Sequence, residues 1–376
     1  GIQKVKGLHL QTLFTQPAGS GWSYIIEFIN KNKAELGLKN FNAILAILTD
    51  WNTKHKKGET TKHASQMALF YYDELTKHGG FRYGERDIEE KVIQVILYGS
   101  FEIKQELSEI IDEIVLTKAI NHRDKYYGLA KAMLSKVSKS FEISLVIPEK
   151  VLNLAKIFWT KDQSNREDYN FHPSDIEDYF GLVHDIQAYF PPSAYKTPIL
   201  NLLRTASDQT INFIIEIVNH SVEHYIKSNL DEVGIEEVDV FIEDSKPIKQ
   251  YVSSRLWEMY RGSHVGPDLL ISIHIALEKW LLEFGKNASK EELEKHCLHL
   301  LKDSKSASIS AVVSSIVFAQ PFKLFNVATI LFKTEAFFFY DTTRLLKERT
   351  QKGTLEMLRD SFPTHDIEDE MYQDDR

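Results

Sequence analysis

Apolar residues return at intervals of three and four positions along nearly the whole of this 376-residue chain. Within 41–51, for example, Phe41, Leu45 and Leu48 share one face of a helix. Such spacing is typical of amphipathic α-helices, and the strict alternation of half-buried strands is rare here. We therefore predict an all-α fold, an array of antiparallel helix pairs that forms either an α-solenoid or a multi-helix bundle. The pattern runs through 41–51, 64–75, 88–99, 103–120, 126–137, 150–159, 176–190, 199–206, 211–226, 248–260, 269–284, 293–301, 309–318 and 325–348.

Local signals place several helix boundaries. Ser289 precedes Glu292 by three residues, the spacing of a capping box, in which the hydroxyl and the carboxylate each satisfy a backbone amide. Ser174 and Glu177 have the same spacing. Three prolines stand where a first helical turn would begin, a position that tolerates a missing N–H: Pro148, Pro198 and Pro267. The best candidates for strands are 238–243 and 141–147.

The segments between the predicted helices suggest how the chain is divided. Most are short, as in an array of helix–turn–helix units, and no repeat of fixed length is visible. The widest, 229–247, is acidic. We predict an N-terminal helical array over 1–228, an acidic linker over 229–247, a C-terminal helical core over 248–362 and an acidic disordered tail over 363–376.

The charge distribution argues against a nucleic-acid partner. Net charge is −9, of which the final segment 365–376 carries −5, so the remaining 364 residues carry −4. A nearly neutral body has no electrostatic footprint for nucleic acid. A basic loop that contains Lys54, Lys56, Lys57 and Lys62 is interrupted by Glu59, and we expect it to be a solvated loop.

Other features bear on compartment and context. Cys297, the single cysteine, excludes an intramolecular disulfide and a cysteine-based zinc cluster, and it suits a reducing compartment. The apolar stretch 307–332 is broken by serines and by Gln320-Pro321, which predicts two buried helices and no membrane span. No secretory signal opens the chain. We therefore expect a cytoplasmic location. An excised domain, a tag scar or a processed terminus would each explain Gly1, and the abrupt end after an acidic run favours a piece of a longer protein.

One short motif offers a metal site. His220, Glu223 and His224 form the pattern H-x-x-E-H, in which two histidines four residues apart can share a zinc ion and the glutamate can activate its water. This alternative makes the chain a zinc-dependent hydrolase with Glu223 as its catalytic residue. A third ligand would also be needed, and the sequence offers Glu232, Glu236 and Glu237 without selecting one.

A solvated helix face explains the same residues more simply. Glu216, His220, Glu223 and Lys227 follow spacings of four, three and four, which makes one polar stripe opposite an apolar one. We therefore favour this account over the zinc site and expect no resident cofactor.

The segment 255–268 offers binding candidates. Arg255, Arg261 and His264 cluster around a glycine- and proline-containing turn, with Trp257 beside them, before a helix that is apolar nearly all round. Free N–H groups at a helix start can bind an anion or a phosphate. The simpler interpretation, which we favour, is a corner between helices in which Trp257 fills the core and Arg261 hydrogen-bonds carbonyls. His274, one turn before Glu278, is expected to be packed.

The usual marks of several enzyme classes are missing from the sequence. It contains no G-x-x-x-x-G-K-[ST], no G-x-G-x-x-G after a strand and no G-x-S-x-G. Nucleotide hydrolysis, dinucleotide chemistry and the α/β-hydrolase mechanism therefore lack support, and an enzyme within this chain is not the favoured prediction.

The same region resembles a known family. The segment 255–268 reads Arg-Leu-Trp-Glu-Met-Tyr-Arg-Gly-Ser-His-Val-Gly-Pro-Asp and is followed at 276–280 by Ala-Leu-Glu-Lys-Trp. Together with 311–315 and 323–327, these residues resemble part of the large bacterial ATP-binding proteins of the antiviral STAND type. The resemblance covers 255–344. It implies an effector, an ATPase and a helical sensor; since the ATPase motif is missing, this chain would be a helical portion, and no catalytic residue can be carried over.

These observations favour a protein-interaction, scaffold or sensor region of a larger intracellular assembly. The resemblance implies a role in bacterial antiphage defence, in which the partner would be a phage protein or other domains of a parent chain. Candidate contact residues are exposed aromatics such as Trp51, Tyr72, Tyr179 and Phe190, although we expect some of these to belong to the core.

Overall fold

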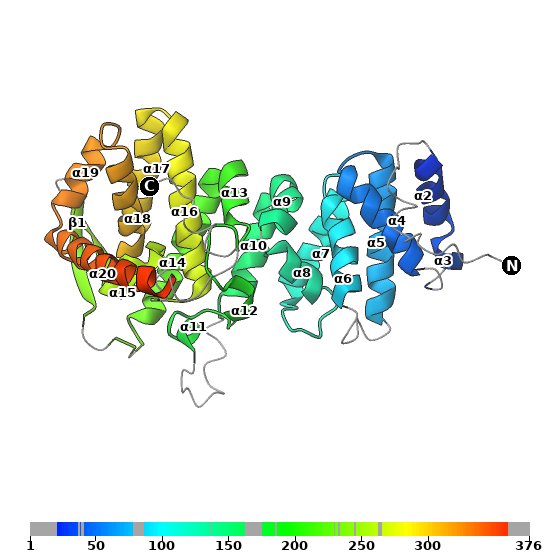
Figure 1. Ribbon diagram of the computed structural model, residues 1–376, viewed down its shortest axis with the longest axis horizontal. Helices are drawn as coiled ribbons and strands as arrows, with labels where there is room; N and C mark the ends of the chain where they lie inside the picture. The colour runs from blue at the N-terminus through cyan, green and yellow to red at the C-terminus, as the bar shows by residue number, and fades with distance from the viewer. Residues whose placement is uncertain are drawn as a thin grey trace. The chain divides into compact units, whose positions relative to one another are not determined.

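The computed structural model (Figure 1) describes residues 21–36, 38, 41–77, 86–135, 137–161, 175–184, 186–228, 230–231, 234–243, 246–261 and 265–359. Its described elements are helices, apart from one two-stranded sheet. The predicted all-α fold is therefore confirmed. The chain divides into two compact units, Gly1–Phe158 and Trp159–Arg376.

A buried asparagine ties three helices of the first unit together. Asn52 on α4 donates to Ser65 Oγ on α5 at 2.9 Å and to the Val95 carbonyl of α6 at 2.8 Å. Leu48 of α4 and Met67 of α5 are fully buried. The helices of this unit are α2 (Gly21–Lys31), α3 (Lys33–Leu36), α4 (Phe41–Lys54), α5 (Glu59–Lys77), α6 (Arg86–Tyr98), α7 (Lys104–Thr117), α8 (Tyr127–Met133), α9 (Val137–Val146) and α10 (Pro148–Trp159), whose last residue opens the second unit.

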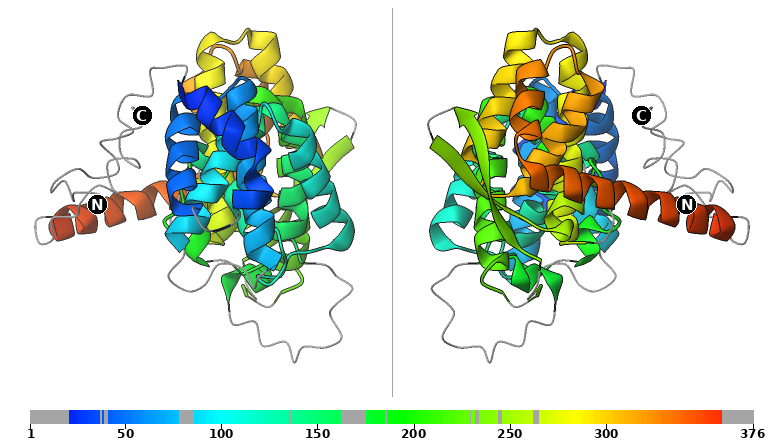
Figure 2. Two further views of the ribbon diagram at one scale, coloured as in Figure 1. Left: turned by 90° about the vertical axis from the view of Figure 1, so that its right-hand side faces the viewer. Right: turned by 90° about the vertical axis from the view of Figure 1, so that its left-hand side faces the viewer.

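The second unit is built around α16, which the sequence pattern places at the centre because it is apolar nearly all round. This helix contacts α12, α13, α17, α18 and η2. The helices of the unit are α11 (Ile176–Tyr179), α12 (Ile186–Tyr189), α13 (Ile199–Thr205), α14 (Ser207–Tyr225), α15 (Ser254–Glu258), η2 (Met259–Arg261), α16 (Asp268–Asn287), α17 (Lys290–Asp303), α18 (Ala307–Ala319), α19 (Phe325–Phe332) and α20 (Glu335–Arg359). Its two strands are β1 (Glu236–Glu243) and β2 (Lys246–Val252), which pair antiparallel and appear as the two arrows in Figure 2.

The hairpin corrects one predicted helix and confirms one predicted strand. The segment 238–243 lies in β1, as expected, but the first part of the predicted helix 248–260 is β2. Ser253 explains the change, because its hydroxyl accepts from Leu256 N at 3.2 Å and starts α15 there. Before it, Gln250 and Val252 are buried at the alternate positions of a strand.

The second strand candidate, 141–147, is wrong, since 137–146 form α9. Ser140, Ile143 and Ser144 are buried and Phe141 is exposed, so burial follows the helical period of three and four. Two other predicted helices, 176–190 and 325–348, are each divided into two shorter ones.

The predicted linker also differs from the structure. The segment 229–247 contains β1, which packs on α17 and α19 inside the second unit. The division falls instead between Phe158 and Trp159, so α11 to α14 belong with the C-terminal helices and not with an N-terminal array ending at 228. The predicted tail, 363–376, lies outside the described residues.

The structure contains several of the predicted helix caps and turns. Ser289 and Glu292 form the expected capping box, with Ser289 Oγ accepting from Glu292 N at 3.2 Å and Glu292 Oε2 from Ser289 N at 3.0 Å. Ser174 lies outside the described residues. Pro148 begins α10, and Pro198 and Pro267 immediately precede α13 and α16. The Gln320-Pro321 turn separates α18 from α19, and no helix of the described chain is long and apolar enough to cross a membrane.

Candidate functional site

Arg255, the first binding candidate, is held by its own chain. Its Nε donates to Asp231 Oδ2 at 2.7 Å and its Nη2 to Asp231 Oδ1 at 3.1 Å, a bidentate pair, and Nη1 donates to the Val265 carbonyl. Hydrogen bonds from Arg255 and Tyr225 lower the pKa of Asp231, and the Asp231 carboxylate raises the pKa of Arg255. The guanidinium is therefore engaged in joining the end of α14 to the α15–α16 corner.

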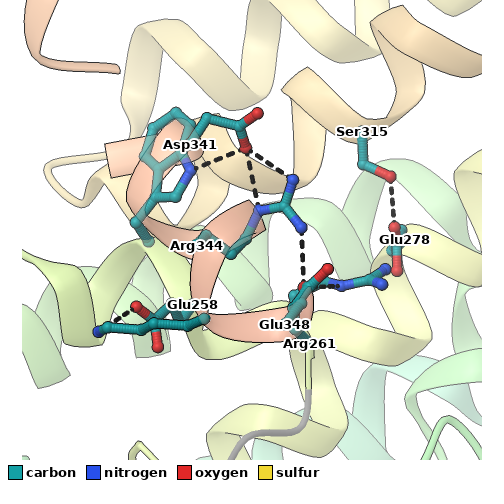
Figure 3. A network of polar contacts seen from close by, with 9 residues as sticks. Glu258, Arg261, Glu278, Ser315, Asp341, Arg344 and Glu348 are labelled. Atoms are coloured by element: carbon teal, nitrogen blue, oxygen red, sulfur yellow. Dashed lines mark hydrogen bonds and ion pairs between the residues drawn. The ribbon is translucent and has the colours of Figure 1, made fainter. Parts of the chain in front are cut away.

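Trp257 and Arg261 join this corner to α20 through the network drawn in Figure 3. Trp257 is 1% exposed, and its Nε1 donates to Asp341 Oδ1 at 3.2 Å. Its ring lies 4.9 Å from that of Phe337. Arg261 Nε donates to Glu348 Oε1 at 2.8 Å. Trp257 thus fills the core as expected, while Arg261 pairs with a carboxylate and not with carbonyls.

A second arginine completes the network from the α20 side. Arg344 Nε donates to Asp341 Oδ1 at 3.0 Å, and its Nη1 donates to Glu348 Oε1 at 2.7 Å. One turn along, Lys347 Nζ donates to Glu258 Oε1 at 2.6 Å. Tyr260, buried beneath, has both guanidinium carbons within 6.0 Å of its ring centre, and burial raises its pKa.

This arrangement holds α20 in place and leaves its arginines engaged with carboxylates of the chain. Each of the arginines at this corner already pairs with a carboxylate, so an incoming anion would have to displace an internal partner. Arg255, Trp257 and Arg261 all lie on α15 and η2, but their side chains make separate contacts, with Asp231 and Val265, with Asp341 and with Glu348 respectively. His264 lies outside the described residues.

The H-x-x-E-H residues lie on α14, facing the 175–184 segment. His220 Nε2 lies 3.0 Å from the Gly181 carbonyl, and His224 Nδ1 lies 2.8 Å from the His220 carbonyl. Because a carbonyl oxygen can only accept, both ring nitrogens must donate. The rings contact each other at 4.3 Å, and Gly181 has φ +64° where a Cβ would meet His224 at 2.5 Å. The histidines therefore pack the turn after α11 onto α14.

The surroundings do not fit a zinc centre in the described part of the chain. Glu223 pairs with Lys305, and this hydrogen bond lowers its pKa, so it is a weak base. Of the predicted third ligands, Glu236 accepts from Tyr340 at 3.4 Å, Glu237 pairs with Lys249, and Glu232 lies outside the described residues. No group of three possible metal ligands occurs among the residues that the structure describes.

His274 is packed, as expected, but its partner is different. It is fully buried on α16, where Nδ1 donates to the Leu270 carbonyl at 2.7 Å and Nε2 accepts from Ser308 Oγ at 2.8 Å. Glu278, the expected partner, accepts from Ser315 instead. Burial lowers the pKa of His274 to about 4, and it raises the pKa of the Cys297 thiol to about 12. Both groups are therefore uncharged parts of the core at neutral pH.

A surface that the sequence did not reveal lies on α19, on α20 and in the turn before α19. Five phenylalanines are exposed there, and we call them the phenylalanine face: Phe322 (95%), Phe325 (70%), Phe332 (55%), Phe338 (48%) and Phe339 (65%). The sequence contains a sign of this surface, since a helix over 325–348 would be apolar on more than one side. The sequence analysis missed the surface because it treated 325–348 as one buried helix and so assigned these phenylalanines to the core.

The aromatics that the sequence offered as contact residues behave differently. Tyr72 is 1% exposed and belongs to the core, whereas Phe190 is 53% exposed. Trp51 and Tyr179 are partly buried, and Trp51 Nε1 donates to Thr61 Oγ1 at 3.2 Å. They do not form the surface that the phenylalanines do.

Comparison with protein-family models gives no match to the chain, and comparison with curated proteins gives none.

Proposed function

We propose that this chain is a helical protein-interaction region of a larger cytoplasmic assembly, a scaffold or a sensor. The observation that carries the proposal is the phenylalanine face. Taking about 200 Å² for a fully exposed phenylalanine, its rings offer roughly 700 Å² of apolar surface, more than the largest patch of a typical monomer. Surfaces of this kind are stable in water when a partner covers them.

The polar side chains that the sequence offered as sites also favour this proposal, because they serve structural roles. The arginines near the α15–α16 corner, and the histidines of α14, have partners within the chain. They hold elements in place and present no assembled catalytic group. A binding role through an apolar surface therefore fits the described residues better than a catalytic role does.

The resemblance of 255–344 to antiviral STAND proteins adds the context of the proposal. That segment contains both the arginine corner and the phenylalanine face. In a bacterial antiphage defence system, the assembly would include other domains of a parent chain or a phage protein. Such a role predicts that a phage protein is among those bound during infection.

Affinity capture with a matched set of variants tests the proposal. The chain, its Phe325→Asp/Phe332→Asp variant and the control Phe190→Asp, which alters an exposed phenylalanine elsewhere, are used as baits in a lysate of the source cells. We expect at least one protein other than the chain itself to be retained by wild type and control and lost with the face variant, as measured by quantitative mass spectrometry. Equal profiles for all three baits would contradict the proposal.

A further inference from the structure

Two exposed apolar stripes meet on the second unit. Phe325 and Phe332 lie seven residues apart on the outward side of α19, opposite the buried Val327 and Leu331, and Phe322 stands in the turn just before them. The rings of Phe332 and Phe338 stack at 5.2 Å and so join this stripe to one on α20. Figure 1 shows α19 and α20 as neighbours, and they are in contact. Within 335–349 of α20, the exposed large apolar residues are Phe338, Phe339, Leu345 (40%) and Leu346 (59%).

The size of this surface matches one half of a protein–protein interface. The roughly 700 Å² offered by the phenylalanines approaches the about 800 Å² that each partner contributes to an interface of standard size. Aromatic residues, phenylalanine among them, are also enriched in protein–protein interfaces. The face is therefore large enough to hold another folded chain.

Several charged side chains beside the face are engaged within the chain, while Lys333, Glu335 and Arg349 are exposed there. Lys347 pairs with Glu258, and Arg344 pairs with Asp341 and Glu348. Lys323, next to Phe322, donates to the carbonyls of Gly285 and Ala288 at 2.8 and 2.9 Å. A partner therefore finds apolar rings at the centre, surrounded by charges that are engaged within the chain or exposed with both signs present.

This neutrality selects the kind of partner. In a two-fold dimer the same patch faces itself, so every uncompensated charge near the axis would meet a like charge. A face of phenylalanines meets no such penalty, because rings stack on rings in offset or edge-on geometry. A heterologous partner recognised by charge would need the opposite pattern, a charged rim with unpaired groups.

We infer that the phenylalanine face of α19 and α20 is a homodimer interface, on which a second copy of this chain docks about a two-fold axis. The inference goes beyond the proposed function, because the occupant that it names is a second copy of the chain and not another protein of the assembly. The net charge of −9 opposes association, but at physiological ionic strength charges more than about 8 Å apart are largely screened. The apolar contact is then expected to persist at high salt.

Sedimentation velocity of the full chain, from 1 to 100 µM in 0.15 and 0.5 M NaCl, tests the inference. Wild type is expected to move from monomer to dimer over this range at both salt concentrations. Phe325→Asp/Phe332→Asp is expected to raise the dissociation constant by about 100-fold or more, since two aromatic contacts are lost. Because both side chains are exposed, circular dichroism should show an unchanged fold.

Two controls give the outcome its meaning. Leu116→Asp, at an 85% exposed apolar residue of α7, and Phe190→Asp should leave the dimer intact. Wild type that is monomeric at 100 µM, or a dimer that the face variant preserves, would overturn the inference. A monomer that still captures a different protein through the face would leave the proposed function standing. A dimer whose face captures no other protein would support the homodimer interface and contradict the proposed role in a larger assembly.

Discussion

Among single residues, His274 gives the clearest link between burial and stability. Its folded pKa of about 4 lies below the ordinary value near 6.5, because burial disfavours the imidazolium. The unfolded chain therefore takes up the proton first as the pH falls. The stability that the neutral histidine contributes is complete above pH 6.5 and is lost between pH 6.5 and 4.

We accordingly expect the unfolding free energy to fall by about 3 kcal/mol from this group between pH 6.5 and 4. Urea unfolding at several pH values measures the slope. His274→Gln, whose amide can still donate to Leu270 and accept from Ser308, should flatten it. His299→Gln, which replaces a partly exposed histidine of α17, is the matched substitution for comparison. Parallel pH profiles for wild type and His274→Gln would show that the buried histidine does not control acid stability.

A second residue-scale prediction concerns Gly99, which follows α6. A Cβ at this position would overlap Ser65 Oγ and lie 2.8 Å from Ser65 Cβ, in the hydrogen-bonded core around Asn52. Gly99→Ala must therefore displace Ser65, and we expect a loss of about 1–3 kcal/mol in urea unfolding. Gly21→Ala is the matched control, since its Cβ would meet nothing within 4 Å. Equal stability of the two variants would contradict this account.

Among the elements, α20 depends most on one carboxylate. Glu348 accepts from Arg261 of η2 and from Arg344 of its own helix, so it ties α20 to the α15–η2 corner (Figure 3). Glu348→Gln removes the charge that both guanidiniums face. Hydrogen bonds to charged groups contribute about 1.5–3 kcal/mol, so local opening of α20 should become roughly tenfold more frequent.

Hydrogen exchange of the amides in 337–348 measures that change. Glu335→Gln, at an exposed carboxylate in the first turn of the same helix, is the control and should change exchange much less, because only its interaction with the helix dipole is lost. The amides of α16 should exchange equally slowly in all three proteins. Unchanged protection of 337–348 in Glu348→Gln would mean that apolar packing of Phe337 and Tyr340 alone holds the helix.

Particular elements show which parts of the structure could be predicted from the sequence. Where one apolar stripe faces one core, as at Phe41, Leu45 and Leu48, periodicity located the helix. It failed at 248–252, because strand pairing with β1 is a contact between segments and leaves little trace in a local window. It also failed to reveal the phenylalanine face, because period alone cannot tell an inward stripe from an outward one. The internal partners of Arg255 and Arg261 lie 24 and 87 residues away in sequence, beyond any local motif.

At the scale of the whole molecule, the position of the division between units can be tested with fragments. Trp159 opens the second unit: it is 2% exposed, donates to Tyr189 Oη at 2.7 Å and packs on Phe213. Helices α13 and α14 supply further core to this unit, where α13 contacts α16 and α14 contacts α17. A fragment 159–376 keeps all of this packing, whereas 248–376, cut at the boundary that composition suggested, loses α13, α14 and the partner strand of β2.

We therefore expect 159–376 to unfold cooperatively in urea and to keep a strongly helical circular dichroism spectrum. The shorter fragment 248–376 exposes the apolar side of α16 and should aggregate or unfold without a cooperative transition, because removing the packed helices opens a large part of the core. If 248–376 proved as cooperative as 159–376, then α13 and α14 would be peripheral to the unit. The division after Phe158 would in that case describe packing in the native state and not an independent folding unit.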